Sequence, residues 1–332
     1  MTPAATSPPR ARPGWRGLAA VFAEVQDLKR QRPAHLPDAL AATLYREAWG
    51  RLLAGEPAAD VADVVAAKAL AGVLLPGCDE TFWGPAGIPA AAAEATLAEA
   101  LATTAAGQLD ANALARLRRA LRRVVAEYEA CAAGREIPGD YRALALPPDV
   151  EALCRQPRAG ATRPGFARLV LTPAESHADH CLLVAVYAAL AAPRYGADRG
   201  VAFRAGLAHH LHNALLPDCG FAGEVLLGDR LGDVVARGRE RALGQLPDHV
   251  AAPTRAALRH HETLDSPEGF AVSAADVLDR VLDVKWRTRA AAVTDADVLG
   301  DLDLVHAGPL RDFQTALLAE AGLWGAAEPE PS

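Results

Sequence analysis

Residues 111–133 read ANALARLRRALRRVVAEYEACAA, and their apolar side chains recur at steps of three and four residues. The positions on this period are Leu114, Leu117, Leu121, Val124, Val125 and Tyr128. Steps of this size place side chains on one face of an α-helix, so the segment predicts an amphipathic helix. Segments 39–53, 61–75 and 90–104 show similar patterns. The arginines between the apolar positions of 111–133 are expected to form its solvated face.

Composition extends this prediction to the whole chain of 332 residues. Apolar residues make up 51% of it and charged residues 23%, which is typical of a globular protein. Aromatic residues contribute only 5%, and the apolar part is mostly Ala, Leu and Val. Ala and Leu cost little on entering a helix, and strand-like runs are scarce. The expected fold class is therefore all-α.

Pro and Gly residues interrupt the helical pattern between Gly134 and Thr172, which is typical of turns and linkers. We place a domain boundary there, near residue 150. The predicted organisation is a disordered N-terminus (1–14), a helical accessory domain (15–150), a second helical domain (151–324) and a disordered tail (325–332). A fragment that begins near Gly165 should then remain soluble and helical.

Charge and cysteine content limit the classes of partner. The formal net charge of −7 disfavours a nucleic-acid-coating protein but permits a small phosphorylated ligand, which needs only a few local cations. The longest apolar stretch, 181–193, is too short to cross a bilayer, and residues 1–14 lack the apolar core of a secretion signal. The five cysteines form no CxxC pair, which indicates reduced thiols. We expect a cytoplasmic protein without nucleic-acid or membrane partners, and leave a homo-oligomer open.

Nine of the ten histidines lie beyond residue 170, a skew that core packing alone does not explain. Most of them fall in three clusters. These are ESHADHCLLV at 175–184, GLAHHLHNALLPD at 206–218, and HHE at 260–262 followed by AAD at 274–276. Imidazoles and carboxylates from several helices are the ligands that a divalent-metal site in a helical bundle requires. The clusters therefore locate the chemistry in the second half of the chain.

The order of these clusters resembles the HD superfamily of metal-dependent phosphohydrolases, over roughly residues 173–324. The pattern of that family is a His on one helix, a His-Asp pair on the next and an Asp on a later helix. Here SHADH supplies His180, AGLAHHL supplies the pair His209 and His210, and SAADVLDRV supplies Asp276. The resemblance implies an all-helical domain in which these four side chains bind a divalent ion (Mn, Co, Fe, Zn or Mg).

Two positions depart from the family pattern. His210 stands where the family has Asp, so the site loses one negative charge and shifts toward nitrogen-liking ions. Asn213 stands where the nucleotidase branch often carries a catalytic Glu, and Asn cannot act as a general base near neutral pH. Another register places His212-Asn213 on the pair. We prefer the first register because Leu207-Ala208 precedes the pair as the family pattern requires.

Further candidates surround this set. His212, Asn213 and Asp218 are candidate catalytic residues, with His212 as the group that orients water or protonates a leaving group. Asp218 resembles a substrate-contacting Asp of the nucleotidase branch, although Pro-Asp-Cys-Gly is also an ordinary turn signal. His260 and His261 resemble the additional histidines of HD branches that bind two metals. The alternative for these two is a solvated helix cap.

Other polar residues have weaker assignments. Arg204 and Arg280 are candidate phosphate ligands, because a guanidinium can bind a phosphate through two parallel hydrogen bonds. His177 is left open between the ligand set and the surface. His249 and His306 are expected to be structural.

The leading hypothesis is a divalent-metal-dependent hydrolase of a phosphorylated, nucleotide-like small molecule. The chief alternative is a diiron HD-type oxygenase, since excess histidine and a missing carboxylate are compatible with iron. The third is a degenerate HD domain that acts as a ligand sensor or scaffold. A metal site requires His180, His209 and Asp276 to converge, although they are far apart in the sequence.

Overall fold

The computed structural model describes residues 14–135, 141, 144–160, 162–165, 168, 172–288, 305 and 308–323. Within these residues the regular elements are helices, apart from one isolated bridge between Pro157 and Ser176. The all-α prediction is therefore confirmed. The ends predicted to be disordered, 1–14 and 325–332, lie outside the described residues except for Gly14, and His306 lies outside them as well. Among the described helices, none is long and apolar enough to cross a membrane.

The helices follow one another along both halves of the chain. The N-terminal half contains α1 (Trp15–Val25), η1 (Gln26–Lys29), α2 (Leu40–Leu53), α3 (Ala58–Leu74), α4 (Glu80–Trp83), α5 (Ala90–Ala105) and α6 (Ala111–Ala132). The C-terminal half contains α7 (Pro148–Arg155), α8 (His177–Tyr195), α9 (Arg199–Ala208), η3 (Leu211–Ala214), α10 (Gly220–Leu227), α11 (Arg230–Leu243), α12 (Asp248–Thr263), α13 (Pro267–Thr288) and α14 (Arg311–Glu320). The four segments in which the sequence predicts amphipathic helices correspond to α2, α3, α5 and α6.

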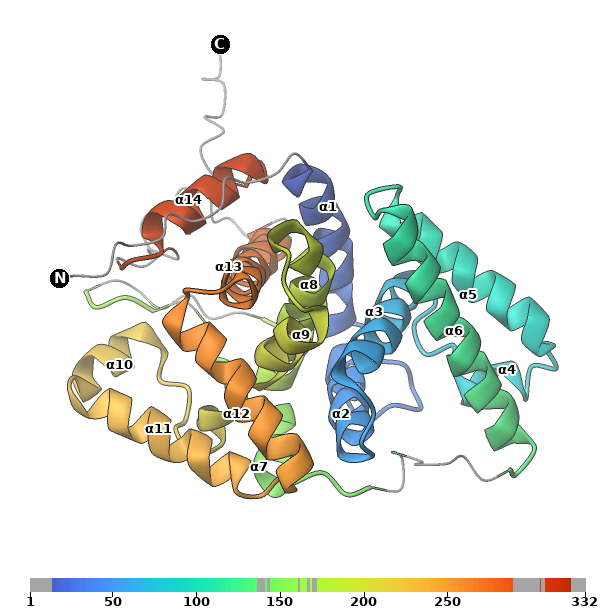
Figure 1. Ribbon diagram of the computed structural model, residues 1–332, viewed down its shortest axis with the longest axis horizontal. Coiled ribbons are helices and arrows are strands. Elements are labelled where there is room, and N and C mark those ends of the chain that lie inside the picture. Colours follow the sequence, from blue (N-terminus) through green and yellow to red (C-terminus); the bar gives the residue numbers. More distant parts are fainter. Residues whose placement is uncertain are drawn as a thin grey trace, which may run out of the picture.

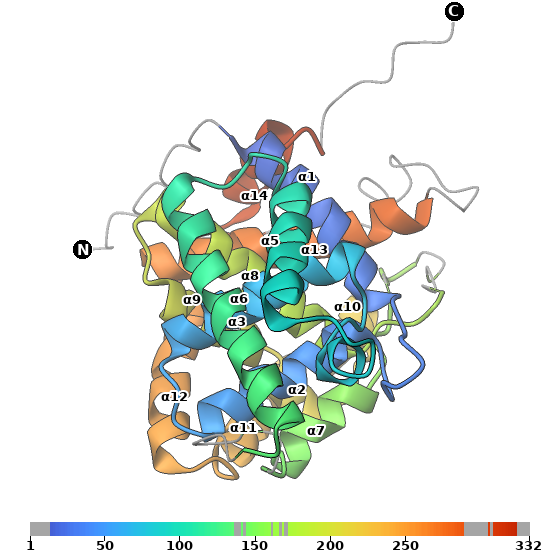
Figure 2. The ribbon, with the colours of Figure 1, turned by 90° about the vertical axis from the view of Figure 1, so that its right-hand side faces the viewer.

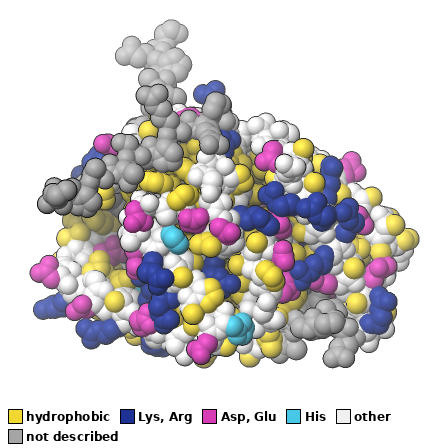
Figure 3. Space-filling model, in the orientation of Figure 1, with side chains coloured by type: hydrophobic (Ala, Val, Ile, Leu, Met, Phe, Trp, Pro, Cys, Tyr) yellow, Lys and Arg dark blue, Asp and Glu magenta, His cyan; other side chains and the backbone are white. Residues whose placement is uncertain are grey.

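Helix α6 shows why a helical period of apolar residues predicts this fold class. Its apolar face packs against α3 and α5, where Leu117, Leu121 and Val124 are buried. Lys and Arg side chains gather on the outer surface over this helix (Figure 3). The exposed arginines of α6 are Arg118, Arg119, Arg122 and Arg123. The predicted solvated face is confirmed.

Helix α8 lies near the centre of the fold, and α2, α3, α9 and α13 pack against it (Figure 1). Its sequence over 181–192, CLLVAVYAALAA, is apolar on every side, which is typical of a helix buried all round. Helix α9 approaches α8 closely at Gly206, because a Cβ atom there would lie 2.8 Å from the Cα of Ala185. This contact holds the C-terminal end of α9 against α8.

Helices from both halves of the chain share one core. Helix α2 packs on α8, and α3 packs on both α8 and α9, as Figure 1 shows; in Figure 2 these helices overlap behind α5 and α6. The buried apolar side chains of the two halves belong to one continuous cluster. The boundary near residue 150 stays a prediction, and the packing between the two halves supplies a way to test it.

A fragment that begins at Gly165 tests whether the C-terminal half folds alone. It would expose the faces of α8 and α9 that α2 and α3 cover, and it would remove Lys29 from the buried Asp279. Removing one partner of a buried ion pair costs about 3 to 5 kcal/mol. In contrast to the expectation from the sequence, these contacts lead us to expect that the fragment aggregates or loses cooperative unfolding, as measured by size-exclusion chromatography and circular dichroism beside the full chain. A soluble fragment that unfolds cooperatively would instead support two domains.

Candidate metal centre

Helix α8 carries the first histidine cluster, and its start is fixed by a capping box. The Ser176 hydroxyl accepts a hydrogen bond from the Asp179 backbone N–H at 3.1 Å, and the Asp179 carboxylate accepts one from the Ser176 backbone N–H at 2.9 Å. These bonds satisfy donors that the first turn of a helix leaves free. His180 therefore has a defined position one turn into α8, and it is fully buried.

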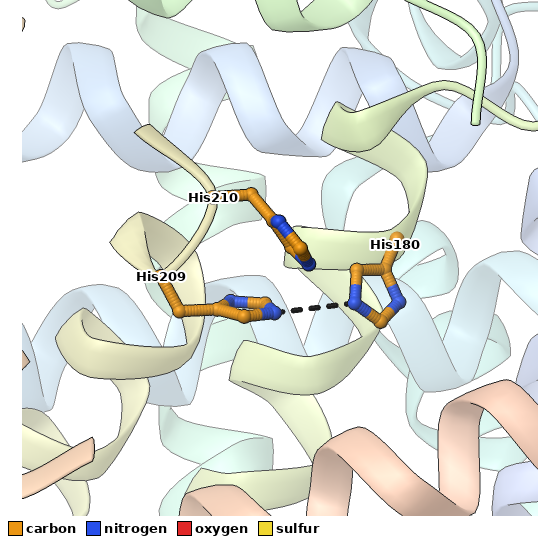
Figure 4. A group of neighbouring side chains, drawn as sticks. All are labelled: His180, His209 and His210. Carbon is orange, nitrogen blue, oxygen red and sulfur yellow. Dashed lines mark hydrogen bonds between the residues drawn. The ribbon is translucent and has the colours of Figure 1, made fainter. Parts of the chain in front are cut away.

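The second cluster lies where α9 ends and η3 begins. Helix α9 stops at Ala208, and the 3₁₀ turn η3 starts at Leu211, so His209 and His210 occupy the junction. Side chains of consecutive residues in a regular helix diverge by about 100°. The change of helical geometry here lets both imidazoles turn toward His180 (Figure 4).

Three imidazoles meet at this point. The Nε2 atoms of His180 and His209 lie 3.1 Å apart. The ring of His210 lies with its centroid 4.2 Å from that of His209 and 5.1 Å from that of His180. Each of the three residues offers a nitrogen within 4.8 Å of the other two. Such spacing is compatible with three bonds to a single small cation.

Asp276 of α13 adds a carboxylate to the three imidazoles. One of its oxygens lies 3.3 Å from His180 Nε2, and the other lies 3.2 Å from Arg280 Nη2. Burial alone would raise the pKa of Asp276, but Arg280 and His180 hold that pKa well below its usual value. Asp276 is therefore ionised near neutral pH. The structure brings His180 next to both His209 and Asp276, as the sequence predicts.

Hydrogen bonds on the far side of two rings fix which nitrogen of each carries the proton. His180 Nδ1 lies 2.6 Å from the Asp279 carboxylate, and His209 Nδ1 lies 2.7 Å from the Gly206 carbonyl oxygen. Both partners can only accept, so both Nδ1 atoms donate. In the neutral rings the Nε2 atoms then carry lone pairs that point at each other.

Asn213 fixes the third ring in the same way. Its amide Nδ2 donates to the Leu216 carbonyl oxygen at 3.1 Å, which orients its Oδ1 toward His210. His210 Nδ1 therefore donates to Oδ1 at 2.7 Å and keeps a lone pair on Nε2. In their neutral forms the three rings thus direct lone pairs into the buried volume that they share with the Asp276 carboxylate. A cation, or a proton taken up by one ring, satisfies this arrangement, so the donor set fits a metal ion.

Burial keeps the neighbouring imidazoles neutral. It is the main cause that lowers the pKa of His209 and His210 well below the usual value for histidine, and the adjacent histidines lower both further. Burial also lowers the pKa of His212 to about 4, helped by the charge of Arg239. Nitrogen lone pairs remain available on these rings at neutral pH, which metal binding requires.

The adjacent residues His260 and His261 separate in the structure. The His261 ring centroid lies 5.4 Å from that of His209, and burial lowers its pKa. His260 instead has its Nδ1 atom 2.8 Å from the Ser266 hydroxyl, at the turn between α12 and α13. Only His261 lies beside the three converging histidines, so a metal role for His260 has no support from this geometry.

Two of the predicted catalytic residues differ in their surroundings: His212 lies near His210, whereas Asp218 lies in a turn. The His212 ring centroid lies 5.5 Å from that of His210. The Asp218 carboxylate accepts hydrogen bonds from the backbone N–H groups of Gly220 at 2.9 Å and of Ala159 at 3.0 Å. Asp218 therefore organises the turn that its sequence context suggests. Their catalytic roles, and that of Asn213, stay predictions.

His177 and Arg158 form a buried group beside the centre. His177 is 1% exposed, and its ring centroid lies 4.9 Å from that of His210. Its Nε2 atom lies 3.5 Å from the Asp218 carboxylate, and neither ring nitrogen makes a hydrogen bond. Burial, followed by the charge of Arg158, lowers the pKa of His177 to about 2. The Arg158 backbone N–H donates to the Glu175 carbonyl oxygen at 2.9 Å, which ties this segment to the start of α8. Sequence patterns missed Arg158 because it lies in the stretch interpreted as a linker.

Three arginines place positively charged guanidinium groups near the histidines of the candidate centre. Arg239 and Arg280 each have a buried Nε atom without a hydrogen-bond partner, and the buried Arg158 Nη1 atom is ion-paired with Glu175 at 3.5 Å. Arg158 lowers the pKa of His210, and Arg239 and Arg280 lower that of His261, after burial as the main cause. These shifts indicate that the guanidinium groups lie close to the histidines.

Two other candidates from the sequence lie in different contacts. Arg204, a candidate phosphate ligand, donates to the Thr254 hydroxyl at 3.2 Å between α9 and α12. His249 is exposed and has its Nε2 atom 3.2 Å from the Leu53 carbonyl oxygen. Arg280 thus lies beside the centre through its pair with Asp276, whereas no contact joins Arg204 or His249 to it.

Comparison with protein-family models, with curated proteins and with solved structures finds no match to this chain. The function must therefore be argued from the site itself, because a fold class hosts many activities.

The neutral histidines predict a loss of stability in mild acid. Burial lowers the pKa of His177 to about 2 and that of His212 to about 4 in the folded chain, whereas the pKa of an unperturbed histidine is about 6.5. Between these values the unfolded chain binds more protons, so the free energy of unfolding falls as the pH drops. The slope approaches about 1.4 kcal/mol per pH unit for each such histidine.

Urea unfolding in the presence of chelator, at several pH values below neutrality, measures this slope. His177→Gln should reduce it by the share of one histidine. An unchanged slope in His177→Gln would show that His177 is protonated in the folded chain.

Proposed function

We propose that the chain is a divalent-metal-dependent hydrolase of a phosphorylated small molecule, of the kind that the HD superfamily represents. The observation that carries the proposal is the convergence of His180, His209 and His210 on one point. Their Nδ1 protons are engaged on the far side of each ring, so their free lone pairs face a shared volume. The adjacent carboxylate of Asp276 supplies the negative charge that a cation needs.

His180, His209, His210 and Asp276 would hold the ion. When bound, a divalent ion supplies Lewis-acid activation of a water molecule and polarises a phosphoryl oxygen. A donor set of three nitrogens and one oxygen suits Mn, Fe, Co or Zn better than Mg, which prefers oxygen ligands.

A phosphorylated substrate is supported by the arginines around the centre. Arg239 and Arg280 retain buried Nε–H donors without a hydrogen-bond partner near the histidines, and the buried Arg158 Nη1 atom lies 3.5 Å from the Glu175 carboxylate. A guanidinium binds phosphate oxygens through charge-assisted hydrogen bonds, and its donors gain most where water is excluded. A nucleotide-like substrate is the form that the family resemblance favours.

His212 and Asn213 would have different roles in this proposal. The low pKa of His212, about 4 and caused mainly by burial, leaves its ring neutral at pH 7. A neutral imidazole accepts a proton or orients a water molecule, so His212 would act as a base rather than as an acid. Asn213 is buried with both ends of its amide engaged, and it would orient His210.

One observation favours the oxidative alternative, a diiron oxygenase. His261 lies beside His209 and adds a fourth imidazole to the region, and nitrogen-rich sites suit iron. Cytoplasmic location is part of both proposals, and the five cysteines, which form no disulfide with one another, support it.

Metal content and turnover decide among the hypotheses. Protein purified without a His tag should contain a divalent ion by elemental analysis, and it should hydrolyse members of a phosphoester panel with added Mn²⁺ or Co²⁺. Chelator should abolish that turnover. A coloured, iron-containing protein that consumes O₂ and spares phosphoesters would favour the oxygenase. A protein that binds no metal would favour the scaffold.

The variant His209→Ala separates a metal ligand from a structural histidine. A ligand that binds only the folded chain adds about 2.7 kcal/mol of stability at a concentration 100 times its Kd. His209→Ala should therefore unfold at lower temperature than wild type with metal present, and the gap should close in chelator. The matched control is His249→Ala, which removes an exposed imidazole and should show no metal-dependent gap. An equal gap with and without chelator would mean that His209 is structural.

A further inference from the structure

The carboxylate of Asp279 joins the histidine cluster to the N-terminal segment. Asp279 lies on α13, and its side chain is fully withdrawn from water. One oxygen accepts hydrogen bonds from His180 Nδ1 at 2.6 Å and from Lys29 Nζ at 2.9 Å. The other accepts from Gln26 Nε2 at 2.8 Å. With three donors around it, this carboxylate has no freedom to rotate.

Lys29 and Gln26 both belong to η1, which lies about 250 residues earlier in the chain than Asp279. Lys29 Nζ also lies 2.7 Å from Glu175 and 3.7 Å from Asp283, and its side chain is 1% exposed. Asp283 in turn pairs with Arg30 and Arg287. The network therefore balances its buried charges with its own residues, and a metal ion is not needed for that balance.

We infer that Asp279 is a positioning residue of the metal centre and that η1 holds its carboxylate in place. This inference rests on the proposed function, because it places an ion at the Nε2 atom of His180. Through Asp279, the N-terminal half of the chain becomes part of the site rather than a separate accessory unit.

Asp279 would position His180 through the hydrogen bond that it accepts from Nδ1, on the side of the ring opposite the metal site. A carboxylate that accepts Nδ1–H selects the tautomer with its lone pair on Nε2, fixes the plane of the ring and raises the basicity of Nε2. Asp276 could not replace Asp279 in this task, because it lies on the Nε2 side of the same ring. Removing such a partner from a ligating histidine typically costs roughly 10- to 100-fold in metal affinity.

A purely structural role for the network is the competing explanation, and Asp283 supplies its control. Asp283 lies one turn further along α13, is equally buried and shares Lys29, but its contacts do not include His180. Asp279→Leu and Asp283→Leu each replace one carboxylate of this network by an apolar side chain of similar size. Both should lower the melting temperature of the metal-free protein.

Metal affinity should separate the two variants. In the full chain, Zn²⁺ affinity measured by competition with a chromophoric chelator should fall roughly 10- to 100-fold in Asp279→Leu and should stay near the wild-type value in Asp283→Leu. Equal losses in the two variants would overturn the inference. If Asp279→Leu does not fold, Asp279→Asn against Asp283→Asn gives the same comparison, with a loss at the lower end of that range.

A second measurement does not depend on metal. Long-range ¹H–¹⁵N correlation spectra of the metal-free protein report the tautomer of each imidazole. His180 should carry its proton on Nδ1 in wild type and in Asp283→Leu, and should populate both tautomers in Asp279→Leu. An unchanged tautomer in Asp279→Leu would overturn the inference. If wild type binds none of Mn²⁺, Fe²⁺, Co²⁺ and Zn²⁺, the proposed function fails, and these spectra still decide whether Asp279 orients His180.

Discussion

The hydrogen bond from His180 to Asp279 links the two helices on which the candidate centre depends. It crosses the core between α8 and α13, and Lys29 of η1 pairs with the same carboxylate. All three side chains are buried. A buried charge is tolerated only when it is paired and hydrogen-bonded, so each member of the group requires the others. The orientation of His180 therefore depends on the packing of the N-terminal segment against α13.

The other two imidazoles are also oriented by hydrogen bonds from Nδ1–H, but their acceptors are uncharged. His209 and His210 donate Nδ1–H to the Gly206 carbonyl oxygen and to Asn213, which leaves their lone pairs directed at His180. Lone pairs that face one another repel, so this arrangement costs free energy unless a cation or proton lies between them. Conflicts of this kind are expected where function, rather than stability, has selected the residues. The close approach of α9 to α8 keeps the rings together despite that cost.

Local patterns in the sequence predict the helices and the histidine clusters, because periodicity and short spacing are properties of neighbouring residues. The family pattern extends this to Asp276, which lies beside His180 as expected. Arg158 escapes prediction because a Pro- and Gly-rich stretch surrounds it, and only the bridge to the start of α8 brings it to the histidines. Lys29 and Asp279 form a pair that no local pattern indicates, since the contact depends on how η1 packs against α13.

Charge determines which ligands a metal centre of this composition would suit. Three neutral imidazoles and one carboxylate would leave a divalent ion with an excess of about one positive charge, whereas an Asp at position 210 would cancel it. Arg158 and Arg239 add no net charge, because each is paired with a carboxylate, Glu175 or Glu262, but Arg239 keeps a buried Nε–H donor without a hydrogen-bond partner. A phosphate monoester is close to a dianion at neutral pH, and it neutralises such a site better than a neutral or singly charged ligand does. With a metal ion bound, His210 would therefore favour a highly charged anion over a neutral ligand, which is compatible with the proposed phosphate chemistry.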